Sequence, residues 1–214
     1  MALGSEGIAG DRFIAQAAMV MRRNWVFWTT RFTARIALAP FFRLVTRGTE
    51  HLPSRGAFVL LPKHQRWVDI PLISLDVPRP LYYIARDDLF HKPIRNWFMR
   101  SVGGIPLNRR RPLMTRESLR ALEEYLREGE GAVVFPEGTY YMNEMGPCRV
   151  GMVRFVFSRF SLPFIPVGIH YAKRSVRTLV RIHFCEARYP DPAISPSPFL
   201  SSIMREIEGL SGLW

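Results

Sequence analysis

The chain has 214 residues, 48% of them hydrophobic, and a formal net charge of +12. This is enough for one sizeable core, and it excludes a second domain unless that domain is a small appendage. The charge comes almost entirely from arginine and favours anionic partners such as phosphates, an anionic membrane surface or nucleic acid.

The cysteines and the apolar stretches exclude further classes of protein. Cys148 and Cys185 are too few for a disulfide framework and lie in no metal-ligand pattern, so we expect free thiols in a reducing compartment. The longest stretches without Asp, Glu, Lys or Arg, residues 160–172 and 192–204, have 13 residues each and are too short to span a bilayer. Acidic residues at positions 6 and 11 argue against a secretory signal. We therefore expect a protein that is neither exported nor integral to the membrane.

Residues 1–47 form an N-terminal unit in which apolar and aromatic residues at helical spacing alternate with arginines. The pattern predicts a pair of amphipathic helices that continues past Pro40. Aromatic-rich apolar faces beside arginine-rich faces are typical of helices that lie in a membrane interface. They are equally typical of a helical pair that packs on the main domain with its arginines in solvent, and both can hold at once.

From Gly56 onward the pattern changes to alternating strands and helices. Apolar runs predict strands over residues 56–61, 81–85, 104–107, 132–135 and 164–169, and a half-exposed edge strand over 178–188. Helices are predicted over residues 93–102, from a cap at Thr115 to a stop at Gly129, over 150–160, and from a cap at Ser197 and Pro198 onward. Strands that alternate with helices predict a mostly parallel sheet flanked by helices, so residues 48–214 form an α/β domain.

His64 and Asp69 follow directly after the first of these strands. A neutral imidazole can take the proton of an attacking hydroxyl, and a carboxylate on its other ring nitrogen fixes the tautomer and stabilises the imidazolium. If the chain turns from strand to helix between them, the two side chains can face each other. The H-x4-D spacing alone also recurs by chance in surface or capping roles. Arg109 and Glu137, each just past a predicted strand, are expected at the same rim, because ligands bind beyond the carboxyl ends of parallel strands.

The ordered set of motifs resembles the glycerolipid acyltransferase family, whose best-known bacterial members make phosphatidic acid from lysophosphatidic acid. Its four blocks are matched by His64 with Asp69, by residues 104–109, by Phe-Pro-Glu-Gly-Thr over residues 135–139, and by an apolar strand with a central proline over residues 164–168. The third block and the order of all four are specific, whereas the first and fourth blocks alone are weak. The resemblance covers roughly residues 45–190.

The resemblance implies transfer of a fatty acyl group from acyl-CoA or acyl carrier protein to the hydroxyl of a lysophospholipid, most simply 1-acylglycerol-3-phosphate. His64 would be the general base and Asp69 its orienting partner. Arg109 would bind the acceptor phosphate, because guanidinium binds phosphate bidentately. The alternative for Arg109 is a solvated surface loop. The reaction needs neither a metal nor a cofactor, and none is expected.

The same resemblance assigns Glu137, Gly138 and Thr139 to the acceptor site. The alternative for Glu137 is a bracing role, in which its carboxylate binds backbone amides or pairs with an arginine. The tetrahedral oxyanion formed on the thioester needs fixed N–H or cationic donors, and loop amides near Gly138 are candidates.

Two positions depart from the family pattern. Many relatives carry arginine directly after the third block, where this chain has Tyr140, so one expected phosphate contact is missing. Arg110, Arg111 or Arg149 can compensate, or the acceptor is a different lysolipid. Arg66 stands where relatives often carry a small polar residue, and it adds positive charge beside the histidine.

A membrane surface with anionic lipids is the expected partner, which predicts a peripheral or monotopic protein at the cytoplasmic face of the cell membrane. A non-catalytic binder of anionic lipid with the same fold is the alternative, and the intact motifs argue against it. Nucleic acid is not expected as a partner, because the sequence has no zinc-finger spacing, basic zipper or RNP-like aromatic block.

Overall fold

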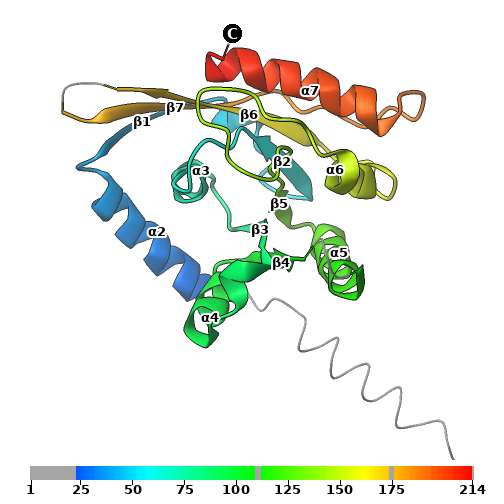
Figure 1. Cartoon of the computed structure of the whole chain (residues 1–214), viewed down its shortest axis with the longest axis horizontal. Helices are drawn as coiled ribbons and strands as arrows, with labels where there is room; N and C mark the ends of the chain where they lie inside the picture. Colours follow the sequence, from blue (N-terminus) through cyan, green and yellow to red (C-terminus); the bar gives the residue numbers. More distant parts are fainter. Residues whose placement is uncertain (1–22, 109–111, 174–175, 214) are drawn as a thin grey trace, which may run out of the picture.

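The computed structural model describes residues 23–108, 112–173 and 176–213, which form a seven-stranded sheet with helices on both sides (Figure 1). The strands lie in the order β1-β7-β6-β2-β5-β3-β4. Their bounds are β1 Phe42–Arg47, β2 Phe58–Pro62, β3 Leu81–Arg86, β4 Gly104–Leu107, β5 Gly131–Val133, β6 Phe164–Ala172 and β7 Thr178–Phe184. Neighbouring strands are parallel except for β6 and β7, which run antiparallel. The mostly parallel α/β sheet predicted from the sequence is therefore confirmed.

Six α-helices and two short 3-10 helices precede, connect or follow these strands in the described ranges. The α-helices are α2 Asn24–Leu38, α3 Asp69–Asp76, α4 Pro93–Ser101, α5 Pro112–Arg127, α6 Val150–Phe157 and α7 Pro196–Ser211, and the 3-10 helices are η1 Thr49–His51 and η2 Asp87–Phe90. Among the described residues, no helix combines the length and the apolar character needed to cross a membrane.

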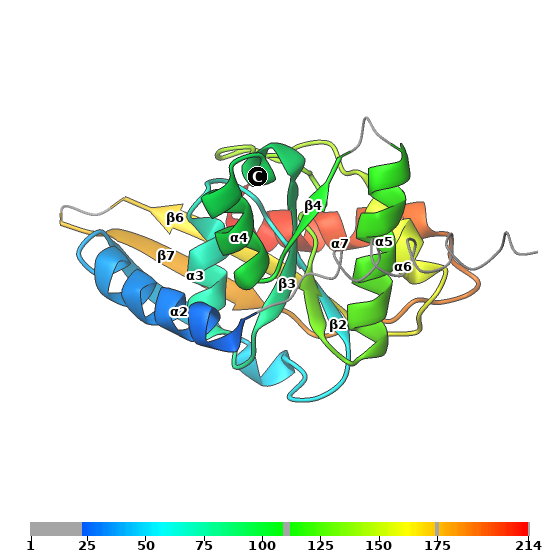
Figure 2. The same ribbon diagram turned by 90° about the horizontal axis from the view of Figure 1, so that it is seen from below.

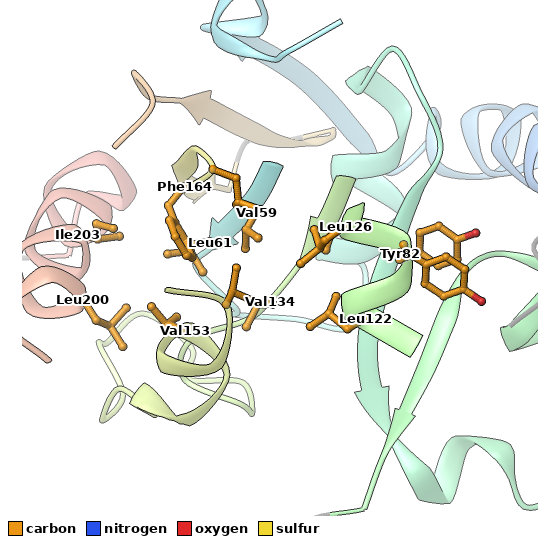
Figure 3. Packing of buried hydrophobic residues seen from close by; sticks show 14 of the residues in the cluster. Val59, Leu61, Tyr82, Leu122, Leu126, Val134, Val153, Phe164, Leu200 and Ile203 are labelled. Carbon is orange, nitrogen blue, oxygen red and sulfur yellow. The ribbon is translucent and has the colours of Figure 1, made fainter. Parts of the chain in front are cut away.

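The central strand β2 explains how the two faces of the sheet each acquire a core. All of its residues are buried, as expected for a strand that is covered on both sides. Because successive side chains point to opposite faces, Val59 and Leu61 join one core while Phe58 and Leu60 join the other. The first core also contains residues of α5, α6 and α7, and Figure 3 shows Leu122, Val153, Leu200 and Ile203 around Val59 and Leu61. The second core includes the apolar residues of α3.

Helix α2 lies beside α3 (Figure 2). Two arginines of α2 attach it to α3. The guanidinium of Arg31 donates to the carbonyls of Leu75 and Val77, both at 2.7 Å, and Arg35 donates to Leu75 at 2.9 Å. These carbonyls lie at the C-terminal end of α3, where backbone acceptors lack partners within the helix and a cation is favoured. The arginines of α2 therefore cap α3.

The N-terminal unit differs from the prediction in one respect. Its first expected helix lies outside the described residues. The second, α2, ends at Leu38 instead of continuing past Pro40, and residues 42–47 form β1, which pairs in parallel with β7. Pro40 has no backbone N–H to continue the helical hydrogen bonds, and the alternating burial along β1 has the period of a strand. The domain division after residue 47 remains a prediction, and β1 shows that residues 42–47 already belong to the sheet.

Three further predictions, one on the position of a strand and two on the start of a helix, are wrong. The strand β7 is not at the edge, because β1 covers its outer side. Helix α5 begins at Pro112, so Thr115 lies inside it and donates from its hydroxyl to the carbonyl of Asn108 at 2.5 Å. The last helix begins at Pro196 after Ser195, two residues before the predicted cap. Each error arises from a local signal that a neighbouring proline or strand overrides.

The predicted end of α5 is confirmed. Arg127 donates to Glu123 at 2.7 Å across one helical turn, which is the expected i,i+4 pair. Gly129 has a φ of +82°, the left-handed conformation that favours glycine after a helix. The chain can therefore turn directly into β5.

Candidate active site

His64 and Asp69 face each other at the carboxyl end of β2. The chain leaves β2 at Pro62 and enters α3 at Asp69, so the strand-to-helix turn that the spacing required is present. His64 Nδ1 lies 3.0 Å from Asp69 Oδ2. Because a carboxylate can only accept, Nδ1 carries the proton and Nε2 is left as the proton acceptor. This is the tautomer that a general base requires.

Asp69 is completely buried, and both of its oxygens are bound by the protein. Its Oδ2 also accepts the backbone N–H groups of Gln65 at 2.6 Å and Arg66 at 2.7 Å. Its Oδ1 accepts the hydroxyl of Tyr171, on β6, at 2.5 Å. A buried carboxylate is stable only when such donors replace water. These donors hold Asp69 as a fixed anion behind the histidine.

Two aromatic rings fix the plane of the His64 imidazole. Phe135 stacks on it with a centroid distance of 3.9 Å and an interplanar angle of 27°. Tyr140 contacts it edge to face, with centroids 4.8 Å apart. His64 is 8% exposed, so its ring is mostly shielded from water. Tyr140 occupies the position where many relatives carry arginine, and here it packs on the imidazole of His64.

Lys63 and Glu137 form a buried ion pair beneath the histidine. Lys63 Nζ lies 2.7 Å from each oxygen of Glu137, and both side chains are inaccessible to solvent. Glu137 also accepts the backbone N–H of His64 at 3.1 Å and that of Gly146 at 2.6 Å. Lys63 further donates to the carbonyl of Tyr141 at 2.9 Å. The pair therefore ties the loop after β5 to the loop that carries His64.

Two tyrosines beside α3 remain protonated hydroxyl donors. Burial raises the pKa of Tyr83 to about 12, and its hydroxyl lies 2.6 Å from that of Ser74. Burial, and secondarily the negative charge and the hydrogen bond of Asp69, raises the pKa of Tyr171 far above its usual value. The Tyr171 hydroxyl therefore stays a donor to Asp69 throughout the physiological pH range.

A cavity of about 1060 Å³ extends from His64 to helix α2. Its lining is largely apolar and comes from α2, α3, β3, η2, α4 and the loop after β5. Representative residues are Phe27, Ala34, Trp67, Ile70, Ile84, Phe98, Met99 and Phe135. Ligand pockets are typically apolar with a few placed polar groups. This cavity suits a long apolar chain whose reactive end lies at His64.

A model of the Acyltransferase family matches residues 43–170, which is more than half of the chain. The chain belongs to the Acyltransferase family. The matched segment contains the His64–Asp69 pair and the ion pair beneath it.

Proteins from plants and bacteria are similar to this chain. The chloroplastic 1-acyl-sn-glycerol-3-phosphate acyltransferase LPAT1 of Arabidopsis thaliana is 31% identical over 55% of this chain and 33% of its own. The 1-acyl-sn-glycerol-3-phosphate acyltransferase of Bacillus subtilis is 30% identical over 56% of this chain and 58% of its own. A lyso-ornithine lipid O-acyltransferase of Rhodobacter capsulatus is 29% identical over 55% and 41%. The matched part of this chain thus covers between 33% and 58% of the length of these relatives.

The same fold occurs in a solved structure. The crystal structure of the 1-acyl-sn-glycerophosphate acyltransferase PlsC from Thermotoga maritima matches with a TM-score of 0.69 and 23% identity, over 95% of this chain and 89% of that one. The likeness extends through nearly the whole chain and supports the α/β architecture described above.

The remaining predicted residues differ in whether they line the cavity. Gly138 and Thr139 line the cavity, and Gly138 has a φ of +69°, which favours glycine. Arg149 is exposed at the start of α6 and is not part of the cavity lining. Arg109 and Arg110 lie outside the described residues. Their predicted contacts with the acceptor remain predictions.

Every hydrogen bond that the structure describes for Glu137 comes from the protein itself. This is the bracing arrangement considered from the sequence, with Lys63 in place of an arginine. A role of Glu137 in binding the acceptor stays a prediction.

Two residues of the site were not predicted from the sequence. Lys63 directly follows an entirely apolar strand, and a lysine at such a position needs a buried anion, which is a signal that could have suggested a pair with Glu137. Tyr171 lies 102 residues after Asp69, and no local spacing connects the two. Only the pairing of β6 with β2 brings it to the site.

Proposed function

We propose that this protein transfers a fatty acyl group from a thioester, acyl-CoA or acyl carrier protein, to the hydroxyl of a lysophospholipid in phospholipid biosynthesis. The preferred acceptor is 1-acylglycerol-3-phosphate, which would give phosphatidic acid. The observation that carries this proposal is the His64–Asp69 hydrogen bond of 3.0 Å at one end of a largely apolar cavity. The names of the relatives support the same acceptor class.

The proposed mechanism uses the tautomer that Asp69 selects. His64 Nε2 takes the proton of the acceptor hydroxyl while the oxygen attacks the thioester carbonyl, and Asp69 stabilises the imidazolium that forms. The tetrahedral intermediate collapses with cleavage of the carbon–sulfur bond. The imidazolium then returns the proton to the departing thiolate, so a thiol and an ester are the products.

The oxyanion of the intermediate needs donors close to His64. The N–H of Gly138 is already bound to the carbonyl of Phe135 at 3.1 Å, which makes it a poor candidate. Within the described part of the chain, no acceptor is found for the N–H groups of Thr139 and Tyr140, and both residues line the cavity. We therefore assign the oxyanion contact to this short loop.

The proposal is tested by acyl transfer from labelled acyl-CoA and acyl carrier protein to a panel of lysolipids. Transfer to lysophosphatidate is the expected result. Transfer to another lysolipid alone would keep the mechanism and replace the acceptor. A folded protein without transfer from either donor to any lysolipid would overturn the enzyme proposal and leave a non-catalytic lipid binder.

The second candidate is an acyltransferase for a different lysolipid, and Tyr140 is the observation that favours it. We expect Tyr140→Arg to raise kcat/KM for lysophosphatidate about tenfold relative to a lysolipid without a phosphomonoester, because a charge-assisted hydrogen bond contributes about 1.5–3 kcal/mol. Competition assays with both acceptors measure the ratio. Tyr189→Arg adds the same charge at an exposed position outside the cavity lining and is the control. An unchanged ratio would contradict a role of Tyr140 in acceptor choice.

A membrane surface is the proposed partner, and helix α2 supplies the reason. Its outward face carries Trp25, Trp28, Phe32 and Ile36, which are 45% to 65% exposed. Exposed rings at helical spacing beside arginines suit a membrane interface. We propose a peripheral or monotopic position at the cytoplasmic face of the cell membrane, with anionic lipids attracting the net positive charge of the chain. That nucleic acid is not a partner stays a prediction.

We expect the double variant Trp25→Ser/Phe32→Ser to bind vesicles of mixed anionic and zwitterionic lipid at least about tenfold more weakly. The reason is that burying one such ring contributes roughly 1.5–3 kcal/mol, and every 1.4 kcal/mol is about tenfold in affinity. Co-sedimentation with vesicles measures the partition. Tyr189→Ser removes an exposed ring elsewhere and should leave binding unchanged. Equal losses in both variants would contradict docking through α2.

A further inference from the structure

The orientation of Asp69 depends on a residue from a distant strand. The three nitrogens that face Asp69 Oδ2, those of His64, Gln65 and Arg66, all belong to the loop between β2 and α3. The hydroxyl of Tyr171 is, among the described residues, the one donor to Oδ1. Rotation of the carboxylate about its Cβ–Cγ bond would move both oxygens, so the hydrogen bond to Oδ1 opposes the same rotation from a second side. Tyr171 therefore adds, from β6, a restraint on the orienting carboxylate that is independent of the loop between β2 and α3.

Arg66 covers the ring of Tyr171. Its guanidinium carbon lies 4.8 Å from the ring centroid, a cation–π distance, and its terminal nitrogen lies 3.9 Å from the sulfur of Met142. Within the described residues its Nε is buried and has no hydrogen-bond partner. The Arg66 side chain thus lies on the face of Tyr171, although in this position its Nε has no hydrogen-bond acceptor among the described residues. The contact holds the ring so that its hydroxyl reaches Asp69.

We infer that Tyr171 is a positioning residue for acyl transfer, which acts through Asp69 on His64, and that Arg66 holds Tyr171 in place. This inference rests on the proposed function. It also explains Arg66, which stands where family members often carry a small polar residue. The contact chain runs from Arg66 to Tyr171, to Asp69 and finally to His64.

The test is Tyr171→Phe, which removes the hydroxyl and keeps the ring for Arg66. We expect kcat to fall about tenfold or more while KM for both substrates stays within about twofold, because small misplacement of a base costs turnover and not binding. Thermal unfolding checks that the variant is folded. Tyr125→Phe removes a buried hydroxyl from α5, outside the cavity lining, and should leave kcat unchanged.

A double-mutant cycle separates positioning from general stability. In an Asp69→Asn background, Tyr171→Phe should have little further effect on kcat, because the hydroxyl acts only through the carboxylate. Equal losses of kcat in both backgrounds would overturn the inference. Full kcat in Tyr171→Phe, with the wild type active and His64→Ala inactive, would also overturn it while leaving the proposed function intact.

If Tyr171→Phe does not fold, variants of Arg66 provide a second test of the inference. We expect Arg66→Gln to lower kcat about two- to fivefold and Arg66→Lys to restore part of it, because a lysine ammonium can also lie over an aromatic face. An unchanged kcat in a folded Arg66→Gln variant would remove Arg66 from the contact chain. Absence of transfer by the wild type to any lysolipid would instead overturn the proposed function, and this inference with it.

Discussion

Replacement of His64 by alanine is expected to lower kcat for acyl transfer by about 10⁴-fold, the upper end of what a general base contributes. The ring lines the cavity, and its Nδ1 lies 3.0 Å from Asp69 Oδ2. Without it, the acceptor hydroxyl must attack with its proton in place. Labelled acyl transfer under saturating donor and acceptor measures the loss.

His51→Ala is the matched control for this change. His51 Nδ1 lies 3.0 Å from the carbonyl of Phe184, so it too is a hydrogen-bonded histidine, and it lies outside the cavity lining. It should keep nearly full activity. If His64→Ala retained more than about a hundredth of wild-type kcat while folded, the base would have to be another group.

Lys63→Met is expected to lower the free energy of unfolding by about 3–5 kcal/mol, because it leaves the carboxylate of Glu137 buried without its counter-charge. The two backbone N–H groups that Glu137 accepts cannot replace the ammonium, which lies 2.7 Å from both oxygens. Urea unfolding followed by tryptophan fluorescence gives the difference.

The double variant Lys63→Met/Glu137→Leu should recover most of that stability, because a buried ion pair replaced by apolar residues of similar volume is often neutral. If the double variant does not recover stability, losing the hydrogen bonds from the N–H groups of His64 and Gly146 to Glu137 costs more than removing the unpaired charge restores. Arg127→Met breaks an exposed ion pair with Glu123 and should cost less than about 1 kcal/mol.

The kinetics of Glu137→Gln distinguish its two possible roles. If Glu137 only braces the loops, kcat at saturating acyl donor and lysolipid should fall, because the backbone of His64 shifts. If it binds the acceptor, KM for the lysolipid should rise while kcat at saturating acceptor survives. The contacts of Glu137 favour the first result.

The sequence predicted those parts of the site that depend on neighbouring residues. The five-residue spacing of His64 and Asp69 requires only a strand end and a helix start, both of which the local pattern indicates. The contacts to Lys63 and Tyr171 depend instead on which strands lie side by side, because β5 and β6 both pair with β2. Sequence periodicity carries no information on that order. The same limit explains β1, whose partner β7 lies more than 130 residues later.

Helix α2 cannot be treated as a detachable anchor. It provides one wall of the cavity through residues such as Phe27 and Ala34, and its Arg31 and Arg35 satisfy the last carbonyls of the helix that begins with Asp69. A shortened chain beginning after Leu38 would open the cavity and leave those carbonyls uncapped. Loss of activity on truncation would then indicate a damaged catalytic centre. Only surface substitutions on the outward face of α2 can separate membrane binding from turnover.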